Sequence, residues 1–241
     1  MNISDKDVVA LQFSGGKDSL ACLFLMQPHW DNLTVYWVNT GAALPETVDL
    51  MEQVRALVPR FVEIRSDQPS DLVANGWPVD ILPIRNSSLM KGLSEKPTLK
   101  LQSFLDCCIR NIMRPLHDRM IADGVTMIIR GQRNQETDKS SLRSGDIMDG
   151  FKFLFPIENW TGEQVRAYLA DKPIKLPASY EDADTSLDCW NCTAWLEDHI
   201  GKQRYLKRVH PEAYTLVREM LTLIEVEIES KRPYLREAIA V

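Results

Sequence analysis

The chain of 241 residues is 44% hydrophobic and has a formal net charge of −6. This length and composition favour one α/β domain with an appendage, or two small domains, with enough apolar residues for a sizeable core. The acidic balance excludes a basic nucleic-acid footprint over the whole surface. Residues 1–7 are too polar for a secretory signal, and no apolar run reaches the roughly 18 residues of a membrane span. We therefore expect a cytoplasmic protein with no membrane contact.

The segment between two apolar runs, over 8–13 and 20–26, predicts a strand, a tight loop and a helix. The residues of this loop are, in order, Ser14, Gly15, Gly16, Lys17, Asp18 and Ser19. The two glycines let backbone N–H groups approach a ligand closely, and the helix points its positive end at the same place. We expect an anion-binding loop suited to phosphates, with Lys17 at its surface.

This loop resembles the PP-loop, Ser-Gly-Gly-x-Asp-Ser, of the ATP pyrophosphatase superfamily, whose members cleave ATP between the α and β phosphates. It differs from the Walker loop, which has four residues between its first glycine and the Gly-Lys pair. The resemblance implies ATP with Mg²⁺ as the ligand. It also implies that Lys17 and the amides of Gly15 and Gly16 hold the pyrophosphate, with hydrogen bonds from Ser14 and Ser19. Asp18 would hold Mg²⁺ or brace the loop.

A second apolar run, over 33–38, predicts a strand that ends at Asn39, Thr40 and Gly41. Two strands joined by a helix should be parallel, and ligands of such sheets lie at the carboxyl ends of the strands. We therefore expect these three residues to bind nucleotide beside the PP-loop. A helix is expected over 45–58, with an inner face marked by Leu50, Val54 and Leu57.

Residues 39–47 resemble a motif of the phosphoadenosine-phosphosulfate reductase family, Asp-Thr-Gly, a short spacer and Pro-Glu-Thr. Here Asn39 replaces the aspartate, which removes a charge. The other interpretation is that Pro45 and Glu46 simply open a helix.

The middle of the chain predicts a strand over 61–64, a proline-broken loop with short helices over 66–100 and a helix over 107–123. The long loop is a segment that could cover the nucleotide. We expect Pro115 to bend the helix.

The next strand, over 126–130, ends at Gly131, Gln132 and Arg133, which the strand-end rule also directs at the site. The guanidinium of Arg133 suits phosphate or sulfate and makes it a candidate catalytic residue beside Lys17 and Asp18. The alternative is a surface arginine.

The rest of the chain predicts a polar stretch over 134–150, a strand over 153–157 and a helix capped by Thr161 and Gln164. These elements indicate a doubly wound, mostly parallel α/β sheet over 1–174 and a helical segment over 175–241. The basic residues over 202–208 favour a solvated helix face over a nucleic-acid surface.

Five cysteines in a protein without a secretory signal indicate metal binding or catalysis rather than disulfides. Cys107 and Cys108 are adjacent, and Cys189 and Cys192 form a Cys-x-x-Cys pair. Four thiolates bind zinc or an iron–sulfur cluster, and redox-active or inert thiols are the remaining alternative. Adjacent cysteines rarely fit one small ion without strain, which favours a cluster. Cys22 lies within an apolar run and is expected to be a buried apolar residue.

The two cysteine pairs resemble the cluster motif of assimilatory adenosine-phosphosulfate reductases, in which a Cys-Cys pair and a distant Cys-x-x-Cys hold a [4Fe–4S] cluster. The resemblance implies that Cys107, Cys108, Cys189 and Cys192 ligate such a cluster here.

Two departures from the reductase pattern favour a different activity. Sulfonucleotide reductases use a cysteine near the C-terminus to attack sulfur, and no cysteine follows Cys192 in this sequence. Reductases also carry altered PP-loops, whereas this loop is intact.

The combination resembles the ATP pyrophosphatase component of DNA phosphorothioation systems. It implies an ATP-dependent sulfur-transfer enzyme that receives sulfur from a cysteine desulfurase or another donor. The acceptor, a DNA, a tRNA or a small molecule, is left open, as is a homo-oligomer. The alternatives are a sulfate-assimilation reductase and a non-catalytic nucleotide-binding or cluster-sensing subunit.

Overall fold

The computed structural model describes residues 3–4, 6–80, 86–87, 99–136, 140–197 and 200–241. Much of the loop expected over 66–100 lies outside these residues. No helix among the described residues is long and apolar enough to cross a membrane.

A six-stranded sheet has the strand order β3-β2-β1-β6-β8-β7. Its strands are β1 (Val9–Gln12), β2 (Leu33–Asn39), β3 (Phe61–Arg65), β6 (Met127–Ile129), β7 (Ile147–Met148) and β8 (Phe151–Leu154). Neighbouring strands are parallel except for the antiparallel pair β7–β8. The strand order reverses between β1 and β6, and in sheets of this kind ligands bind at the carboxyl ends of the strands beside such a reversal.

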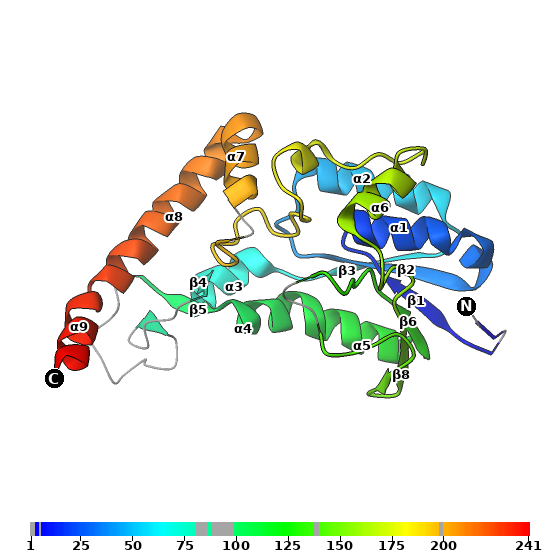
Figure 1. Cartoon of the computed structure of the whole chain (residues 1–241), viewed down its shortest axis with the longest axis horizontal. Coiled ribbons are helices and arrows are strands. Elements are labelled where there is room, and N and C mark those ends of the chain that lie inside the picture. Colours follow the sequence, from blue (N-terminus) through cyan, green and yellow to red (C-terminus); the bar gives the residue numbers. More distant parts are fainter. Residues whose placement is uncertain (1–2, 5, 81–85, 88–98, 137–139, 198–199) are drawn as a thin grey trace.

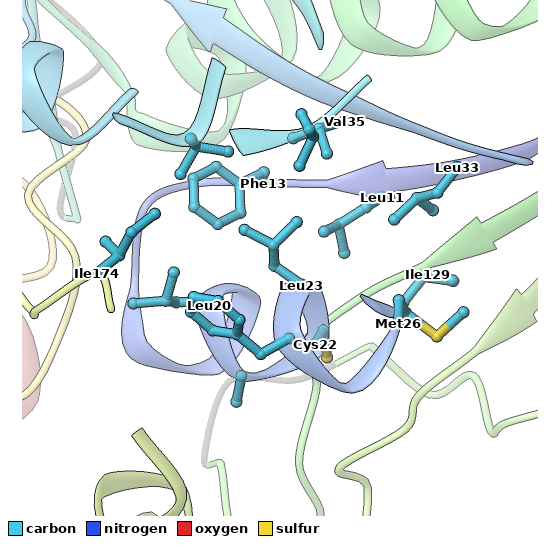
Figure 2. Close-up of a cluster of buried hydrophobic side chains, with 14 of the residues drawn as sticks. Leu11, Phe13, Leu20, Cys22, Leu23, Met26, Leu33, Val35, Ile129 and Ile174 are labelled. Carbon is cyan, nitrogen blue, oxygen red and sulfur yellow. The ribbon is translucent and has the colours of Figure 1, made fainter. Parts of the chain in front are cut away.

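Helices cover both faces of the sheet, which confirms the doubly wound α/β fold (Figure 1). On one face lie α1 (Lys17–Leu25), α2 (Pro45–Leu57) and α6 (Gly162–Leu169), and on the other lies α5 (Arg114–Ala122). Figure 2 shows the core on the α1 side, where Leu20 and Leu23 pack with Leu11 and Phe13. Burial of such apolar side chains contributes about 25 cal/mol per Å² and holds the PP-loop between two rigid elements.

The chain between β3 and β6 contains α3 (Gln68–Asn75), a two-stranded sheet of β4 (Trp77–Val79) and β5 (Leu101–Ser103), and α4 (Phe104–Cys108). A π-helical turn (Ile109–Met113) separates α4 from α5. The helical path from α4 to α5 is continuous, and the π-helical turn lies immediately before Pro115, which is in the first turn of α5. A bend caused by Pro115, which has no backbone N–H, stays a prediction.

The C-terminal region contains a short helix, η5 (Ala178–Glu181), followed by α7 (Ile200–Val209), α8 (Pro211–Glu229) and α9 (Arg232–Ala240). Leu187 of the preceding segment packs with Leu206 of α7 and Val217 of α8. Figure 1 shows α8 leading away from the sheet, with α9 at its far end. A domain boundary at 174/175 stays a prediction.

Three further expectations concern the buried face of α2, the stretch over 134–150 and the start of α6. Leu57 is 36% exposed, and Met51 takes its place on the buried face of α2. The polar stretch over 134–150 contains β7, because Ile147 and Met148 pair with β8. The capping box of Thr161 and Gln164 at the start of α6 is confirmed, with both hydrogen bonds present.

Candidate active site and cysteine pocket

The PP-loop joins β1 to α1 in a conformation that needs its first glycine. Gly15 has φ +81°, and a Cβ there would lie 2.8 Å from Cε of Met51. Inside the loop, the amide of Gly16 donates to Oγ of Ser14 at 3.3 Å, and Oγ of Ser19 donates to the carbonyl of Gly16 at 2.9 Å. These bonds fix the curvature of the loop at the N-terminus of α1.

Lys17 is covered by a segment that we call the strap, residues 178–188. The backbone N–H of Lys17 donates to the hydroxyl of Tyr180 at 2.8 Å. Its ammonium donates to the carbonyl of Asp184 at 2.9 Å and lies 3.5 Å from the Asp184 carboxylate. The expectation that Lys17 lies at the loop surface was wrong, since it is only 3% exposed. Oxygen atoms of the strap therefore accept hydrogen bonds from both the backbone and the side chain of Lys17.

The strap is held over the loop from the side of α6. Arg166 of α6 forms an ion pair with Asp184, and its guanidinium lies 5.7 Å from the centre of the Tyr180 ring. Burial raises the pKa of Tyr180, which keeps its hydroxyl protonated. Asp188, at the end of the strap, is exposed, and its carboxylate accepts a hydrogen bond from Oγ of Ser186 at 3.5 Å.

The loop after β6 packs directly on the PP-loop, as the strand-end rule predicted. A Cβ at Gly131 would lie 2.6 Å from the backbone carbon of Asp18, so only glycine fits there without movement. Nε of Arg133 donates to Asp18 at 2.7 Å, and the ammonium of Lys17 lies 3.4 Å from the same carboxylate. Asp18 thus braces two cations. Arg133 is 8% exposed and engaged with Asp18 rather than standing at the surface.

The segment at the end of β2, residues 39–41, contacts a cysteine as well as the edge of the sheet. Nδ2 of Asn39 donates to Glu63, and its Oδ1 accepts from the amide of Gly41 at 3.1 Å. Thr40 is buried, and its hydroxyl lies 3.4 Å from Sγ of Cys189. Among the described contacts, Thr40 therefore belongs with the cysteines. A nucleotide-binding role for Asn39, Thr40 and Gly41 remains a prediction.

The four paired cysteines line one pocket, although about 80 residues separate the two pairs. Cys107 and Cys108 end α4, and Cys189 and Cys192 follow the strap; all four are free thiols. Gln68, Pro78, Phe104, Asn111 and Ile112 complete the lining. The fifth cysteine, Cys22, is fully buried in the core, as expected.

Burial makes the four thiols reluctant to ionise on their own. Desolvation raises the pKa of Cys107 to about 12 and that of Cys108 to about 11, and it also raises the pKa values of Cys189 and Cys192. Each pair feels the charge of the other, because Cys192 contributes to the shift of both Cys107 and Cys108. Thiolates in such a pocket need a cationic group, which a bound metal centre supplies.

In the described part of the chain, no three His, Cys, Asp or Glu side chains lie close enough together to hold a single metal ion. Four thiols that line one pocket are a donor set that iron–sulfur clusters and zinc both use.

The basic stretch of α7 does not form one solvated face. Lys202 is fully buried beside Cys192, and Tyr205 is buried and donates to Glu46. Arg208 pairs with Glu181 and Asp182. The expectation of a solvated face was wrong for Lys202 and Tyr205, which are buried. Three cations of the stretch are exposed as expected: Arg204, Lys207 and Arg208.

The sequence did not single out the strap residues Tyr180 and Asp184. Tyr180 lies in the short helix η5 and Asp184 in the segment after it, neither within a recognisable motif, and their positions beside Lys17 depend on how the chain returns over α6. An ordinary spacing signal could not have identified them.

Comparison with known proteins places the chain in a family. A model of the phosphoadenosine phosphosulfate reductase domain matches residues 8–195. The chain belongs to this family. That match contains both the PP-loop and all four pocket cysteines.

Two curated relatives are distant. A phosphoadenosine 5'-phosphosulfate reductase of Gloeobacter violaceus is 25% identical over 199 residues, 80% of this chain and 74% of the relative. An adenosine 5'-phosphosulfate reductase of Deinococcus radiodurans is 23% identical over 160 residues, 66% of this chain but only 56% of the relative.

A solved structure supports the fold. The crystal structure of phosphoadenylyl-sulfate reductase from Candida auris, a phosphate complex, aligns with a TM-score of 0.50 at 16% identity. The alignment covers 71% of this chain and 76% of that one. At this identity the likeness concerns the fold.

Proposed function

We propose that the chain is an ATP-dependent enzyme that cleaves ATP between the α and β phosphates and activates an acceptor for sulfur transfer. The observation that carries the proposal is the intact PP-loop, with Lys17 at its centre, joined by the strap to a pocket of four cysteines. Family membership supports an adenine nucleotide as the ligand.

The chemistry follows from what the loop can donate. An oxygen of the acceptor attacks the α-phosphorus of ATP, the bond to the bridging oxygen breaks, and pyrophosphate leaves. The amides of Gly15 and Gly16 and the ammonium of Lys17 stabilise the charge that develops on pyrophosphate, together with the Mg²⁺ that ATP carries. Sulfide, or the terminal sulfur of a donor persulfide, then attacks the activated acceptor and displaces AMP. With a persulfide, a second thiol cleaves the S–S bond to the donor cysteine and forms a disulfide with it. A cysteine desulfurase would be a suitable donor, and a nucleic acid a suitable acceptor.

Asp18 and Arg133 position Lys17 in this site. Asp18 accepts from Arg133 and lies within ion-pair distance of Lys17, which orients the lysine toward the loop. The strap oxygens on Lys17 mark where phosphate oxygens would bind. For pyrophosphate to bind Lys17, Tyr180 and Asp184 must move away, or they must share the N–H donors of Lys17 with the phosphate oxygens.

We further propose that Cys107, Cys108, Cys189 and Cys192 hold a [4Fe–4S] cluster. Thiolate-ligated iron would provide this site with electron-transfer or Lewis-acid chemistry. The pocket lies at the end of the strap, so the strap connects the pocket to the PP-loop.

A reductase acting on a phosphosulfate nucleotide is the second candidate, because both curated relatives carry such names. The two functions are separated by products. Anaerobically purified protein is incubated in two ways. One reaction contains ATP, Mg²⁺, a sulfide source and acceptor nucleic acid, and the other contains adenosine phosphosulfate and a thiol. We expect pyrophosphate from ATP and no sulfite. Sulfite from the phosphosulfate, with no pyrophosphate from ATP, would establish the reductase instead.

A further inference from the structure

Arg130, which directly follows β6, is a partly buried arginine whose side chain has no partner in the protein. Its backbone N–H extends the sheet by donating to the carbonyl of Leu154 at 3.1 Å. In the described part of the chain, its guanidinium makes no hydrogen bond, no ion pair and no contact over an aromatic ring. Burial lowers the pKa of this guanidinium, and only Glu136 opposes the shift among the described groups. A desolvated cation without a close counter-charge costs stability, so folding alone does not explain an arginine here.

Arg133, three residues later, is an arginine whose donors are engaged by the protein. Its Nε donates to the carboxylate of Asp18 at 2.7 Å, and its backbone N–H donates to Oε2 of Glu136 at 3.3 Å. Its Nη2 lies 3.7 Å from Oε1 of Glu136. Both carboxylate oxygens of Glu136 are thus directed at Arg133, and Glu136 forms no ion pair with Arg130 in the described structure. The two arginines therefore differ in what they leave available for a ligand.

Arg130 lies where a ligand of this sheet would bind. The strand order reverses between β1 and β6; the PP-loop follows β1, and Arg130 follows β6. Gly131 packs against the PP-loop, because a Cβ there would lie 2.6 Å from the backbone carbon of Asp18. One residue therefore separates Arg130 from direct contact with the loop. No guanidinium nitrogen of Arg130 is among the described buried atoms that lack a partner, so its N–H donors still reach solvent and a ligand can reach them.

We propose that Arg130 binds the α-phosphate of the adenine nucleotide, the group that stays on the adenylate when pyrophosphate leaves. The inference rests on the nucleotide site of the proposed function. In that site the amides of Gly15 and Gly16 and the ammonium of Lys17 hold the pyrophosphate, and Arg133 braces the loop. Arg130 offers the α-phosphate a planar pair of N–H donors that matches two phosphate oxygens. Its charge stabilises the α-phosphoryl group while that group is attacked.

The test compares Arg130→Met, Arg130→Lys and the control Arg204→Met in the full chain. Arg204 is an exposed arginine of α7. Titration calorimetry measures the binding of AMP, of pyrophosphate with Mg²⁺ and of a single-stranded oligonucleotide. We expect Arg130→Met to bind AMP about tenfold or more weakly, the typical effect of losing a charged hydrogen bond, and to bind the other two ligands as the wild type does. Arg130→Lys should recover part of the AMP affinity, because it keeps the charge without the planar fork.

Melting temperatures separate a binding role from a structural role. Because the guanidinium has no protein partner, ligand-free Arg130→Met should melt at the wild-type temperature or above it. AMP should raise the melting temperature of the wild type and of Arg204→Met, and it should raise that of Arg130→Met much less.

Unchanged AMP affinity in folded Arg130→Met would overturn the inference. A loss of affinity confined to the oligonucleotide would overturn it as well, because it would assign Arg130 to the acceptor. Wild-type protein that binds AMP through Arg130 but releases no pyrophosphate from ATP would defeat the proposed function instead, which is a different result.

Discussion

The PP-loop and the cysteine pocket satisfy their polar groups in opposite ways. Around the loop, the amide and ammonium of Lys17 are bonded to the strap, and Asp18 is bonded to Arg133. Around the pocket, four desolvated thiols face one another, and a buried lysine lies behind one of them. The donors of Lys17 thus already have protein oxygen atoms as acceptors. The four thiols would gain a cationic centre only from a bound group, as the proposed function requires.

This contrast indicates how each region responds to its ligand. Under the proposed function, a nucleotide at the loop exchanges strap oxygens for phosphate oxygens, so the net free energy of binding is reduced by the bonds that are lost. A cluster in the pocket, as proposed, would add a partner for the thiols, so its binding would contribute directly to stability. The predictions below test this difference, starting with the largest effect.

Replacing any one pocket cysteine with serine should remove most of the bound iron and its colour. We expect about four irons per chain in anaerobically prepared wild type and a large loss in Cys107→Ser, Cys108→Ser, Cys189→Ser or Cys192→Ser. The matched control is Cys22→Ser, because Cys22 lies in the core away from the pocket. Iron and sulfide analysis decides the matter. One zinc and no iron in the wild type would contradict the cluster.

Replacing Lys17 with alanine should abolish pyrophosphate release and weaken ATP binding by roughly 1.5–3 kcal/mol, the contribution of a charge-assisted contact. Since Lys17 also holds the strap, titration calorimetry should be accompanied by a circular dichroism spectrum. Lys207→Ala is the control for loss of a lysine. A folded Lys17→Ala protein with normal turnover would exclude the loop from the active site.

Replacing Gly131 with alanine should displace the PP-loop, because the new Cβ would lie 2.6 Å from the Asp18 backbone. We expect a loss of about 1–3 kcal/mol in the free energy of unfolding, the typical cost of overpacking, and weaker ATP binding. Gly162→Ala is the control, since its Cβ would have only an ordinary contact at 3.8 Å with Arg133. Equal denaturation midpoints for both variants would show that the loop adapts.

Replacing Tyr180 with phenylalanine removes the oxygen that accepts from the Lys17 amide. If this hydroxyl competes with a phosphate oxygen, ATP should bind more tightly, by about 1 kcal/mol, the net value of one neutral hydrogen bond. Tyr168→Phe on α6 is the control, because that ring packs against Trp160. Weaker ATP binding in Tyr180→Phe would mean that the hydroxyl serves the ligand instead of competing with it.

The features that could be predicted from the sequence are those set by local chemistry. The glycines of the PP-loop, the alternation of strand and helix and the capping box at Thr161 are each fixed within a few residues. Strand-end geometry also predicted that Gly131 and Arg133 lie at the loop. The partners of Lys17 could not be predicted in this way, because Tyr180 returns from more than 160 residues away.

The burial of individual polar side chains could not be predicted from the sequence either. The hydroxyl of Thr40 and the ammonium of Lys202 both lie beside cysteine residues, and neither position follows from a motif. Lys202 belongs to a run of cations that suggests solvent exposure, but Gly201 allows α7 to pack closely enough to bury it. Such contacts depend on the crossing of distant segments, which no local pattern encodes.

The identity of the bond that is broken in ATP tests the account most directly. Phosphorus NMR of a reaction with ATP, Mg²⁺, a sulfur donor and acceptor nucleic acid reports the products without a coupling enzyme. The account predicts AMP and pyrophosphate in equal amounts from the wild type, and none from Lys17→Ala. ADP and inorganic phosphate, or intact ATP beside sulfite released from a phosphosulfate nucleotide, would contradict it.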